Sequence, residues 1–549
     1  MNLAELFIKC LEQQNVEYIF GVPGEENIDL LDALHESSIE FIPCRHETGA
    51  AFIAGMMGKL TGKPGVCLST LGPGATNMMT GVACATLDRM PLIAITAQTD
   101  VPMQIEGTHQ YLNVIDMYRP ISKWGTSIQN GTVLPNIVSD AFQSAVSDAP
   151  GSIHLELPND IASLPVAGQP GPLPIPPKQK TMTVSQSNFH DVATAINQAE
   201  APLMFIGHRA ANSETSPAVL SFIEKLQVPF TETYMAKGVV PGNHSLHMQT
   251  IGLPEGDFVN QAFDFTDLII TIGYDPIEYG TQKWNKAQKP IIHIDYQAPA
   301  KTDPFYPIKN TLIGDLSSNL QILTKWIQPR NEMSSAYRQL KEVITSDLAF
   351  HSTSDSNPLT PQRIIQEIRA VLAPDDLLLS DVGAHKLWIG RQYDALNPNT
   401  CIISNGLASM GIGLPGAIGA KLACPNKKVL AVCGDGAFLM SLPELETAVR
   451  LELPIVIMVW RDGRYAAIEW EQQYKLGRSL GVQFDNTNFV ELAKTFGAKG
   501  YVVEEASQLA DIMQKAFSEK GPVLIECPVD YTENSRLSER LNSFKSAFL

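Results

Sequence analysis

The sequence has few cysteines and no hydrophobic segment long enough to span a membrane. Its eight cysteines include no C-x-x-C pair, and most of them stand in apolar runs. This usage favours buried free thiols in a reducing cytoplasm. No run of about 18 or more apolar residues occurs, so we expect no transmembrane helix and no membrane partner.

Basic residues are also scarce, because 40 Lys and Arg stand against 58 Asp and Glu, a formal net charge of −18. A nucleic-acid partner would require a basic face, so this balance argues against one. The N-terminal stretch MNLAELFIKCLEQQNVEYIF carries acid early and alternates polar with apolar residues. It predicts an amphipathic helix followed by a strand, not a signal peptide. We therefore expect a cytoplasmic protein.

The 549 residues suffice for roughly three domains. Two segments interrupt the apolar pattern, a Pro-rich linker (164–180) and a polar linker (346–361), and they separate domains at 1–163, 181–345 and 362–549. Apolar runs such as PLIAITAQ, DLIITIG and PIVIMVW alternate with longer helical patterns. Runs without internal alternation are typical of parallel strands covered on both faces, so we expect an α/β fold with three doubly wound parallel sheets.

The first and third domains share a loose plan of a Gly-rich turn, a small-residue helix and an apolar strand. This plan indicates two related domains around a different middle one. Open parallel sheets place their ligands at the carboxyl ends of strands, so site residues are expected in the turns that follow strands. The C-terminal YTENSRLSERLNSFKSAFL fits either a short helix closing over the site or a frayed tail.

The strongest motif lies in the third domain. One strand ends in Gly434-Asp435-Gly436, and the next ends at Asp462, about one strand-helix-strand crossover later. Both aspartates should reach the same edge of the sheet, where two carboxylates suit Mg²⁺ and the glycines admit a phosphate. On spacing alone, two unrelated turn aspartates are an equally good interpretation.

This segment resembles the signature of thiamine diphosphate (ThDP) enzymes, in which a GDG is followed by an Asn-Asn or similar pair; here the pair is Arg461-Asp462. The resemblance implies ThDP as cofactor and Mg²⁺ held by the side chains of Asp435 and Asp462 and the backbone carbonyl of Arg464. The other cofactor contacts that it implies in this domain are Gly434, Gly436, Ala437 and Tyr465, together with Val382, Gly383, Ala384 and His385 from the turn DVGAHKLW.

The resemblance also identifies the residue that activates the cofactor. Taken alone, Glu47 is an ordinary acid at a helix start, but the strand-RHE-small-residue pattern around it matches the family's catalytic glutamate. In the family this glutamate is hydrogen-bonded to N1′ of the aminopyrimidine and favours the imino tautomer, whose nitrogen takes the C2 proton.

Further residues match positions around the pyrimidine end of the cofactor. Pro23, Gly74 and Asn77 are expected near it, the carbonyl of Ala408 would receive the 4′-amino group, and Met410 would be the apolar wedge that folds the cofactor. In this family the two ends of one cofactor are held by different subunits. The resemblance therefore implies a homodimer at least, and a homotetramer is common.

The resemblance covers essentially the whole chain and is closest to the acetolactate synthases, particularly the FAD-independent catabolic type. Supporting stretches include SNGLASMGIGLP, WRDGRYAAI and LGVQF. The FAD-dependent type usually carries an RFDDR-like stretch where this chain reads GYDPIEYG, so no FAD is expected. The implied reaction is decarboxylation of a 2-keto acid, pyruvate, and joining of the remaining two-carbon unit to a second pyruvate, giving 2-acetolactate and CO₂.

Two positions depart from the catabolic pattern, although His109 and Gln110 match its His-Gln pair. Glu25 stands where these enzymes tend to have Ala, and Glu471 where they have Gln. Carboxylates beside the reacting carbon would serve as proton donors if burial raised their pKa values. The alternatives are therefore a simple 2-keto acid decarboxylase that releases an aldehyde, or a carboligase with another acceptor; Glu25 as a helix cap and Glu471 on a solvated helix face are the simpler interpretations. A non-catalytic regulatory subunit of this fold is a remote alternative.

Overall fold

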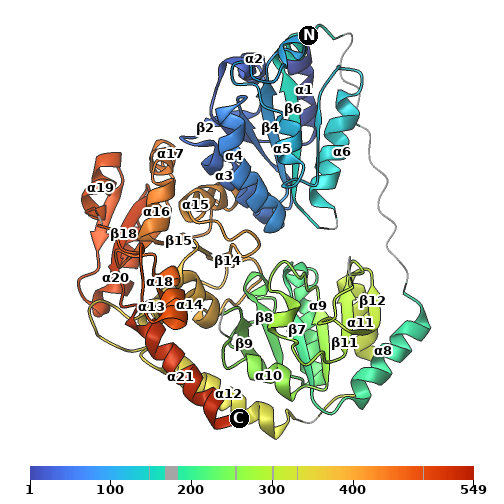
Figure 1. Cartoon of the computed structure of the whole chain (residues 1–549), viewed down its shortest axis with the longest axis vertical. Coiled ribbons are helices and arrows are strands. Elements are labelled where there is room, and N and C mark those ends of the chain that lie inside the picture. Colours follow the sequence, from blue (N-terminus) through green and yellow to red (C-terminus); the bar gives the residue numbers. More distant parts are fainter. Residues whose placement is uncertain are drawn as a thin grey trace.

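The computed structural model describes residues 1–147, 149–166, 173, 184–253, 256–299, 302–330, 332–485 and 487–548. Apart from 164–166 and 173, the predicted Pro-rich linker lies outside the described residues. Three six-stranded sheets form the three lobes of Figure 1, blue, green to yellow, and orange to red. Their strand pairs are parallel. The expected α/β class with three parallel sheets is confirmed.

The N-terminal sheet has the strand order β2-β1-β3-β4-β6-β5. It follows an amphipathic helix, as the sequence predicts, and the structure shows that this helix starts with a capping box between Asn2 and Glu5. β4 and β6 are buried along their whole length, as expected for strands covered on both faces. The elements are α1 Leu3–Gln13, β1 Tyr18–Gly21, the 3₁₀ turn η1 Glu25–Asn27, α2 Ile28–His35, β2 Glu40–Pro43, α3 Glu47–Thr61, β3 Gly65–Ser69, α4 Pro73–Leu87, β4 Leu92–Gln98, α5 Val114–Tyr118, β5 Trp124–Ser127, α6 Leu134–Val146, β6 Ser152–Pro158 and α7 Asn159–Ala162.

The C-terminal sheet has the order β14-β13-β15-β16-β18-β17, which repeats the N-terminal order strand for strand. This agrees with the prediction of two related domains. In both sheets the strand order reverses direction, so crevices open at the carboxyl ends of β1 and β3 and of β13 and β15. The elements are α13 Pro361–Val371, β13 Leu377–Ser380, α14 Ala384–Gln392, β14 Cys401–Ile403, α15 Gly413–Ala423, β15 Val429–Gly434, α16 Asp435–Ser441, α17 Glu444–Arg450, β16 Val456–Arg461, α18 Ala466–Leu476, α19 Phe489–Phe496, β17 Lys499–Val502, α20 Leu509–Phe517, β18 Val523–Pro528 and α21 Thr532–Phe548.

The middle sheet has a different order, β12-β11-β10-β7-β8-β9. Counted from its own first strand this is 3-2-1-4-5-6 read from the other edge, the order of dinucleotide-binding domains, with its crevice between β7 and β10. The elements are α8 Gln186–Gln198, β7 Pro202–Ile206, α9 Ser216–Leu226, β8 Phe230–Thr233, β9 His247–Ile251, α10 Asn260–Phe265, β10 Leu268–Ile272, β11 Ile291–Asp295, β12 Ile308–Ile313, α11 Leu316–Trp326 and the connecting helix α12 Ser335–Ala349.

The first and third domains pack on each other through α3 and α15, which lie side by side near the centre of Figure 1. The helices approach closely because α15 carries Gly419, where an added Cβ would lie 2.3 Å from the carbonyl oxygen of Ile53. Apolar side chains of both helices belong to one buried cluster. The N-terminal half of the chain therefore rests on its own C-terminal half.

The C-terminal segment is a helix, α21, and not a frayed tail. It packs against the third domain, where Trp388 Nε1 donates to Asn534 Oδ1 (2.8 Å) and Trp470 Nε1 donates to Ser538 Oγ (2.8 Å). In Figure 1 it runs beside the connecting helix α12. Trp470 lies on α18, which follows the Asp462 turn, so α21 supports the element next to the predicted metal site.

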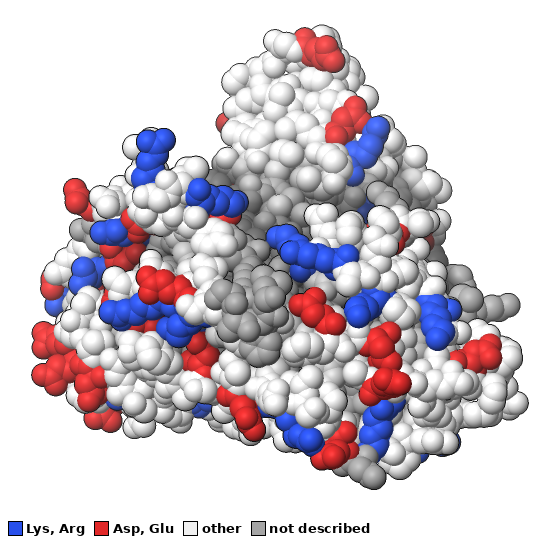
Figure 2. Space-filling view, turned by 60° about the horizontal axis from the view of Figure 1, so that its bottom comes forward, with Lys and Arg blue, Asp and Glu red and all other residues white. Residues whose placement is uncertain are grey.

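The cysteines, the helices and the surface charges bear on the expectations drawn from composition. All eight cysteines lie in the described part of the chain as free thiols, and seven of them are buried. No helix among the described residues has both the length and the apolarity to cross a bilayer. On the face shown in Figure 2, Lys and Arg atoms are interspersed with Asp and Glu atoms, whereas a nucleic-acid-binding face would gather the basic ones.

Candidate active site

A cavity of about 110 Å³ opens at the carboxyl ends of β13, β15 and β16. Every site residue predicted in the third domain lines it, except Ala408 and Glu471. Tyr531, which the sequence did not single out, also lines it and arrives from the segment before α21. The doubly wound topology thus gathers residues from five separate segments, each of which follows a strand, into one crevice.

Asp435 and Asp462 form the polar centre of this cavity. The Asp435 carboxylate accepts the backbone N–H groups of Asp462 (3.0 Å) and Gly463 (2.7 Å), so it holds the turn that carries the second aspartate. Asp462 Oδ2 is buried without a hydrogen-bond partner among the described residues. Burial, and then the charge of Asp435, raise the pKa of Asp462 to about 8. An unpartnered buried carboxylate oxygen beside a second carboxylate fits a divalent cation.

The protein supplies only part of a coordination shell here. Within the described residues, no group of three or more His, Cys, Asp and Glu side chains is placed to hold a metal ion. Two carboxylates with a backbone carbonyl and phosphate oxygens are the ligand set that Mg²⁺ commonly takes. The donor set therefore suits a cation that arrives together with a phosphate.

The turn after β13 lies on one side of the aspartates. The His385 ring fills the space beside Gly383 and Gly434, since an added Cβ would lie 2.8 Å and 3.3 Å from it. Burial lowers the pKa of His385 to about 3, so the ring is neutral, and its Nε2 has no hydrogen-bond partner among the described residues. On the other side, the Tyr465 ring packs over Gly436. The three glycines, which have no Cβ, leave room for the His385 and Tyr465 rings at this edge.

Met410 lies on a loop that a second buried aspartate holds. Asp381, fully buried, accepts the backbone N–H groups of Gly411 and Gly413 (both 2.9 Å) and of Val382 (2.7 Å). It thereby joins the turn after β13 to the loop of Met410. Within this loop Ala408 has a φ of +56°, a conformation that costs a non-glycine residue about 1 kcal/mol. Sequence reasoning missed Asp381, although an aspartate directly after the apolar strand LLLS is a signal of the same kind as Asp435.

The other predicted residues lie at the carboxyl edge of the N-terminal sheet. Glu47 is the first residue of α3 and is buried, and its Oε2 accepts a hydrogen bond from Asn77 Nδ2 (3.0 Å). Gly74 lies beside it, because an added Cβ there would be 3.3 Å from Glu47 Oε1. The structure therefore brings together the glutamate and the two α4 residues predicted near the pyrimidine.

Four more predicted residues border this edge. Pro23, Glu25, His109 and Gln110 are exposed in the isolated chain. Glu25 begins η1, and its backbone carbonyl accepts the Ile28 N–H, but its carboxylate makes no hydrogen bond among the described residues. The side-chain cap of this turn comes instead from Asn27, whose Oδ1 accepts the Gly24 N–H (3.0 Å). The carboxylate of Glu25 is thus free to face another molecule at the crevice between β1 and β3.

Glu471 lies outside the 110 Å³ cavity. It belongs to α18, pairs with Lys475 one turn later, and lines a separate small cavity with Trp470 and Leu541 of α21. The simpler interpretation, a helix-face carboxylate in an i,i+4 ion pair, describes its contacts in the isolated chain.

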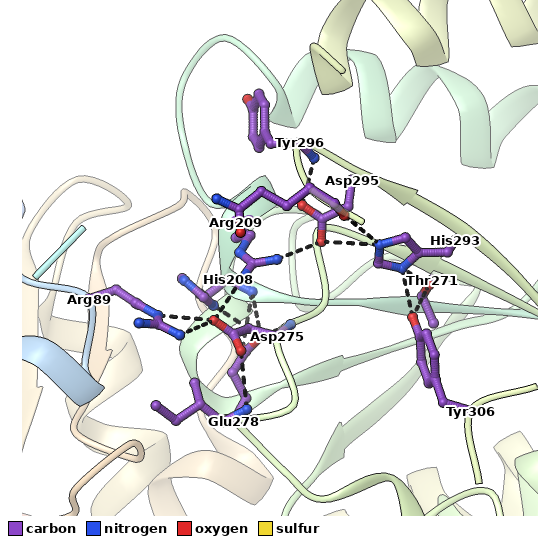
Figure 3. Close-up of polar contacts among 12 residues, drawn as sticks. Arg89, His208, Arg209, Thr271, Asp275, Glu278, His293, Asp295, Tyr296 and Tyr306 are labelled. Carbon is purple, nitrogen blue, oxygen red and sulfur yellow. Dashed lines mark hydrogen bonds and ion pairs between the residues drawn. The ribbon is translucent and has the colours of Figure 1, made fainter. Parts of the chain in front are cut away.

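The crevice of the middle sheet contains an ion-pair network (Figure 3). Arg209, after β7, contacts Asp275 (2.9 Å) and Asp295 (2.9 Å), and Arg89 of the N-terminal domain also contacts Asp275 (2.7 Å). Burial disfavours the charge of Asp275, but Arg209 and Arg89 outweigh it and hold the pKa of this carboxyl below its usual value. The network lies at the carboxyl edge of this sheet, where the topology places ligands, and the Arg89–Asp275 ion pair ties the middle domain to the first.

Family comparisons agree with this geometry. Residues 1–117 match the N-terminal TPP binding domain of thiamine pyrophosphate enzymes, residues 189–323 their central domain and residues 381–527 their C-terminal TPP binding domain. The chain belongs to the thiamine pyrophosphate, or thiamine diphosphate, enzyme family.

Within this family the chain is similar to acetolactate synthases over nearly its full length. It is 35% identical to the acetolactate synthase of Bacillus subtilis (strain 168), over 97% of this chain and 94% of the relative. It is 34% identical to the catabolic acetolactate synthase of Raoultella terrigena, over 98% of this chain and 97% of the relative. It is 30% identical to the large subunit of acetolactate synthase isozyme 2 of Escherichia coli (strain K12), over 97% of this chain and 96% of the relative.

Proposed function

We propose that the protein is a FAD-independent acetolactate synthase that decarboxylates pyruvate and joins the two-carbon unit to a second pyruvate, releasing CO₂. The proposal rests on the paired half-sites, the Asp435–Asp462 cavity and the Glu47–Asn77 pair, in a chain that aligns with acetolactate synthases nearly end to end. Bound ThDP supplies an electron sink for the pair released when a 2-keto acid loses CO₂.

The residues of the chain have separate tasks in this proposal. Glu47 holds a proton at N1′ of the aminopyrimidine, and Asn77 orients its carboxyl group. Asp435, Asp462 and the carbonyl of Arg464 would hold Mg²⁺, which would neutralise the charge of the diphosphate. Met410 would supply an apolar surface against the cofactor and would exclude water from the reacting centre.

A second copy of the chain is proposed to complete each site. The described residues that line the Asp435 cavity all belong to the third domain, so Glu47 is not among them. Apolar side chains are exposed in both domains, Ile28, Met103 and Ile105 in the first and Met440, Ile468 and Leu476 in the third, and Ile468 lines the Asp435 cavity. A second subunit that covers the half-sites would also cover apolar surface of this kind. We propose a homodimer in which Glu47 of one copy faces the Asp435 cavity of the other, and a homotetramer built from two such dimers.

Hybrid dimers test this arrangement. Glu47→Gln and Asp435→Ala homodimers are expected to be inactive, whereas co-expression should restore activity, because one site of each mixed dimer then receives both intact halves. In a random mixture about a quarter of the wild-type activity is expected. Separately tagged chains, purified as hybrids, allow the turnover per dimer to be measured. Inactive hybrids would contradict a site shared between chains.

The middle-domain network supports the proposal that no FAD is bound. Asp275, Glu278 and Asp295 bring carboxylates to the crevice between β7 and β10, and Arg209 is already engaged by two of them. A pyrophosphate would meet negative charge there and would have to displace these ion pairs. A stoichiometric flavin absorption band in the purified protein would contradict this part of the proposal.

Product analysis with pyruvate, Mg²⁺ and ThDP decides between synthase and decarboxylase. We expect 2-acetolactate, detected as acetoin after acid treatment. Acetaldehyde without a five-carbon product would instead support the decarboxylase, which the unpartnered carboxylate of Glu25 favours as second candidate. Glu25→Ala should raise the ratio of acetolactate to acetaldehyde, because it removes a proton donor from the pocket. An unchanged ratio would return Glu25 to a surface role.

A further inference from the structure

The first and third domains each contribute one buried carboxylate that accepts hydrogen bonds from the backbone of the other domain. Asp88, at the end of α4, reaches the loop that leads to Met410, and Glu444, at the start of α17, reaches the turn that leads to Glu47. Each has only 1% of its surface exposed. Neither belongs to the half-sites described above.

Asp88 holds the start of the Met410 loop. Its Oδ1 accepts the backbone N–H groups of Asn405 (3.2 Å) and Gly406 (2.6 Å), and its Oδ2 accepts the Ser404 hydroxyl. The contact requires glycine at 406, because an added Cβ would lie 2.1 Å from the Leu87 carbonyl oxygen and 2.8 Å from Asp88 Oδ1. Asp381 holds the other end of the same loop.

Glu444 holds the start of α3 in the same manner. Its Oε1 accepts the backbone N–H groups of Arg45 (3.1 Å) and His46 (3.0 Å), and its Oε2 accepts the Thr447 hydroxyl (2.7 Å). A glycine is again required, since a Cβ at Gly49 would lie 2.4 Å from Glu444 Oε1. Both carboxylates therefore accept two successive backbone N–H groups and press against a glycine of the other domain.

We propose that Asp88 and Glu444 are positioning residues, Asp88 for the Ala408–Met410 loop and Glu444 for Glu47. The reason is geometric. Ala408 has a left-handed backbone and does not keep it without support at the loop ends. Glu47 is the first residue of a helix, so its carboxylate follows the position of the two residues before it, which Glu444 fixes. The identity of the cofactor rests on the proposed function, but the hydrogen bonds by which Asp88 and Glu444 hold the two backbone segments, here called the clamps, do not.

Hydrogen exchange of the cofactor-free protein tests the clamps without any assay of activity. Asp88→Ala is expected to increase exchange in residues 404–413 and leave 45–50 unchanged, and Glu444→Ala should give the opposite pattern. Asp376→Ala is the matched control, because this carboxylate also accepts two backbone N–H groups, from Ala373 and Lys428, but lies at the amino end of β13, at the far edge of the sheet. Exchange in both segments equal to that of the control would overturn the proposal.

Kinetics distinguish positioning from stability alone. Glu444→Ala should lower kcat about 10²-fold, the scale of a misplacement of about 1 Å. Glu444→Gln should restore it, because the amide oxygen still accepts the Arg45 and His46 N–H groups. Gly49→Ala and Gly406→Ala disturb the same contacts without removing a carboxylate, and they serve where an alanine variant fails to fold. If Glu444→Gln loses as much kcat as Glu444→Ala, or if neither glycine variant loses any, positioning is excluded. Failure of pyruvate turnover in the wild type would overturn the proposed substrate but would leave the exchange results standing.

Discussion

Glu47→Gln is expected to lower turnover by about 10²- to 10⁴-fold, the usual contribution of a positioned acid–base group. The amide keeps the shape of the side chain and its contact with Asn77, but it cannot exchange a proton with the pyrimidine ring nitrogen. The affinity for ThDP should change little, because the residues proposed to hold the diphosphate and Mg²⁺ lie in the third domain. Titration of cofactor binding and the rate of CO₂ release from pyruvate measure the two quantities separately.

Glu40→Gln is the matched control for this variant. Glu40 is an exposed glutamate at the first residue of β2, the strand that leads to the Glu47 turn, but it lies at the opposite end of that strand. Its turnover should equal that of the wild type. A Glu47→Gln protein as active as the control would remove Glu47 from the mechanism.

Asp435→Ala is expected to weaken the binding of Mg²⁺ and ThDP by about 100-fold or more, because the loss of a ligand should cost at least as much as the loss of an outer-shell partner. Asp435 has two tasks at once. It supplies a carboxylate, and it holds the turn of Asp462 through the N–H groups of Asp462 and Gly463. Its removal therefore disturbs both proposed side-chain ligands together. Calorimetric titration of Mg²⁺ in the presence of ThDP measures the loss.

Asp462→Asn provides the contrast, because the amide oxygen remains able to ligate a cation. It also leaves the hydrogen bonds of Asp435 to the backbone in place. We expect this variant to keep affinity within about tenfold of the wild type. Equal losses in Asp435→Ala and Asp462→Asn would show that Asp435 acts only as a ligand and does not organise the turn.

Much of the third-domain half-site is predictable from sequence. Asp435 and Asp462 follow successive strands of one crossover, so local topology alone brings them together. The order of the strands is harder to predict from the sequence, because the order that the first and third sheets share depends on pairing between distant segments. Resemblance to a family was needed to select Glu47, because an acid at a helix start is common for electrostatic reasons.

Two of the residues that sequence reasoning missed, Asp88 and Glu444, act over long separations. Asp88 accepts from Gly406 across 318 positions, and Glu444 from Arg45 across 399. Neither carboxylate belongs to a recognisable short motif, because each accepts backbone N–H groups that lie far away in the sequence. Tyr531 enters the cavity because α21 folds back on the third domain, and the sequence left open whether that segment was a helix at all.

The hydrogen bonds that Asp88 and Glu444 accept from the other domain have a consequence for folding during synthesis. During synthesis the first domain leaves the ribosome before the third-domain partners of Asp88 and of the Arg45 and His46 amides have been made. Residues 404–406 and 444 follow only several hundred positions later. At about 5–20 residues per second, the nascent first domain waits tens of seconds for these contacts. The turn that carries Glu47 therefore gains its hydrogen bonds to Glu444 late in synthesis, and until then its backbone is accessible to chaperones.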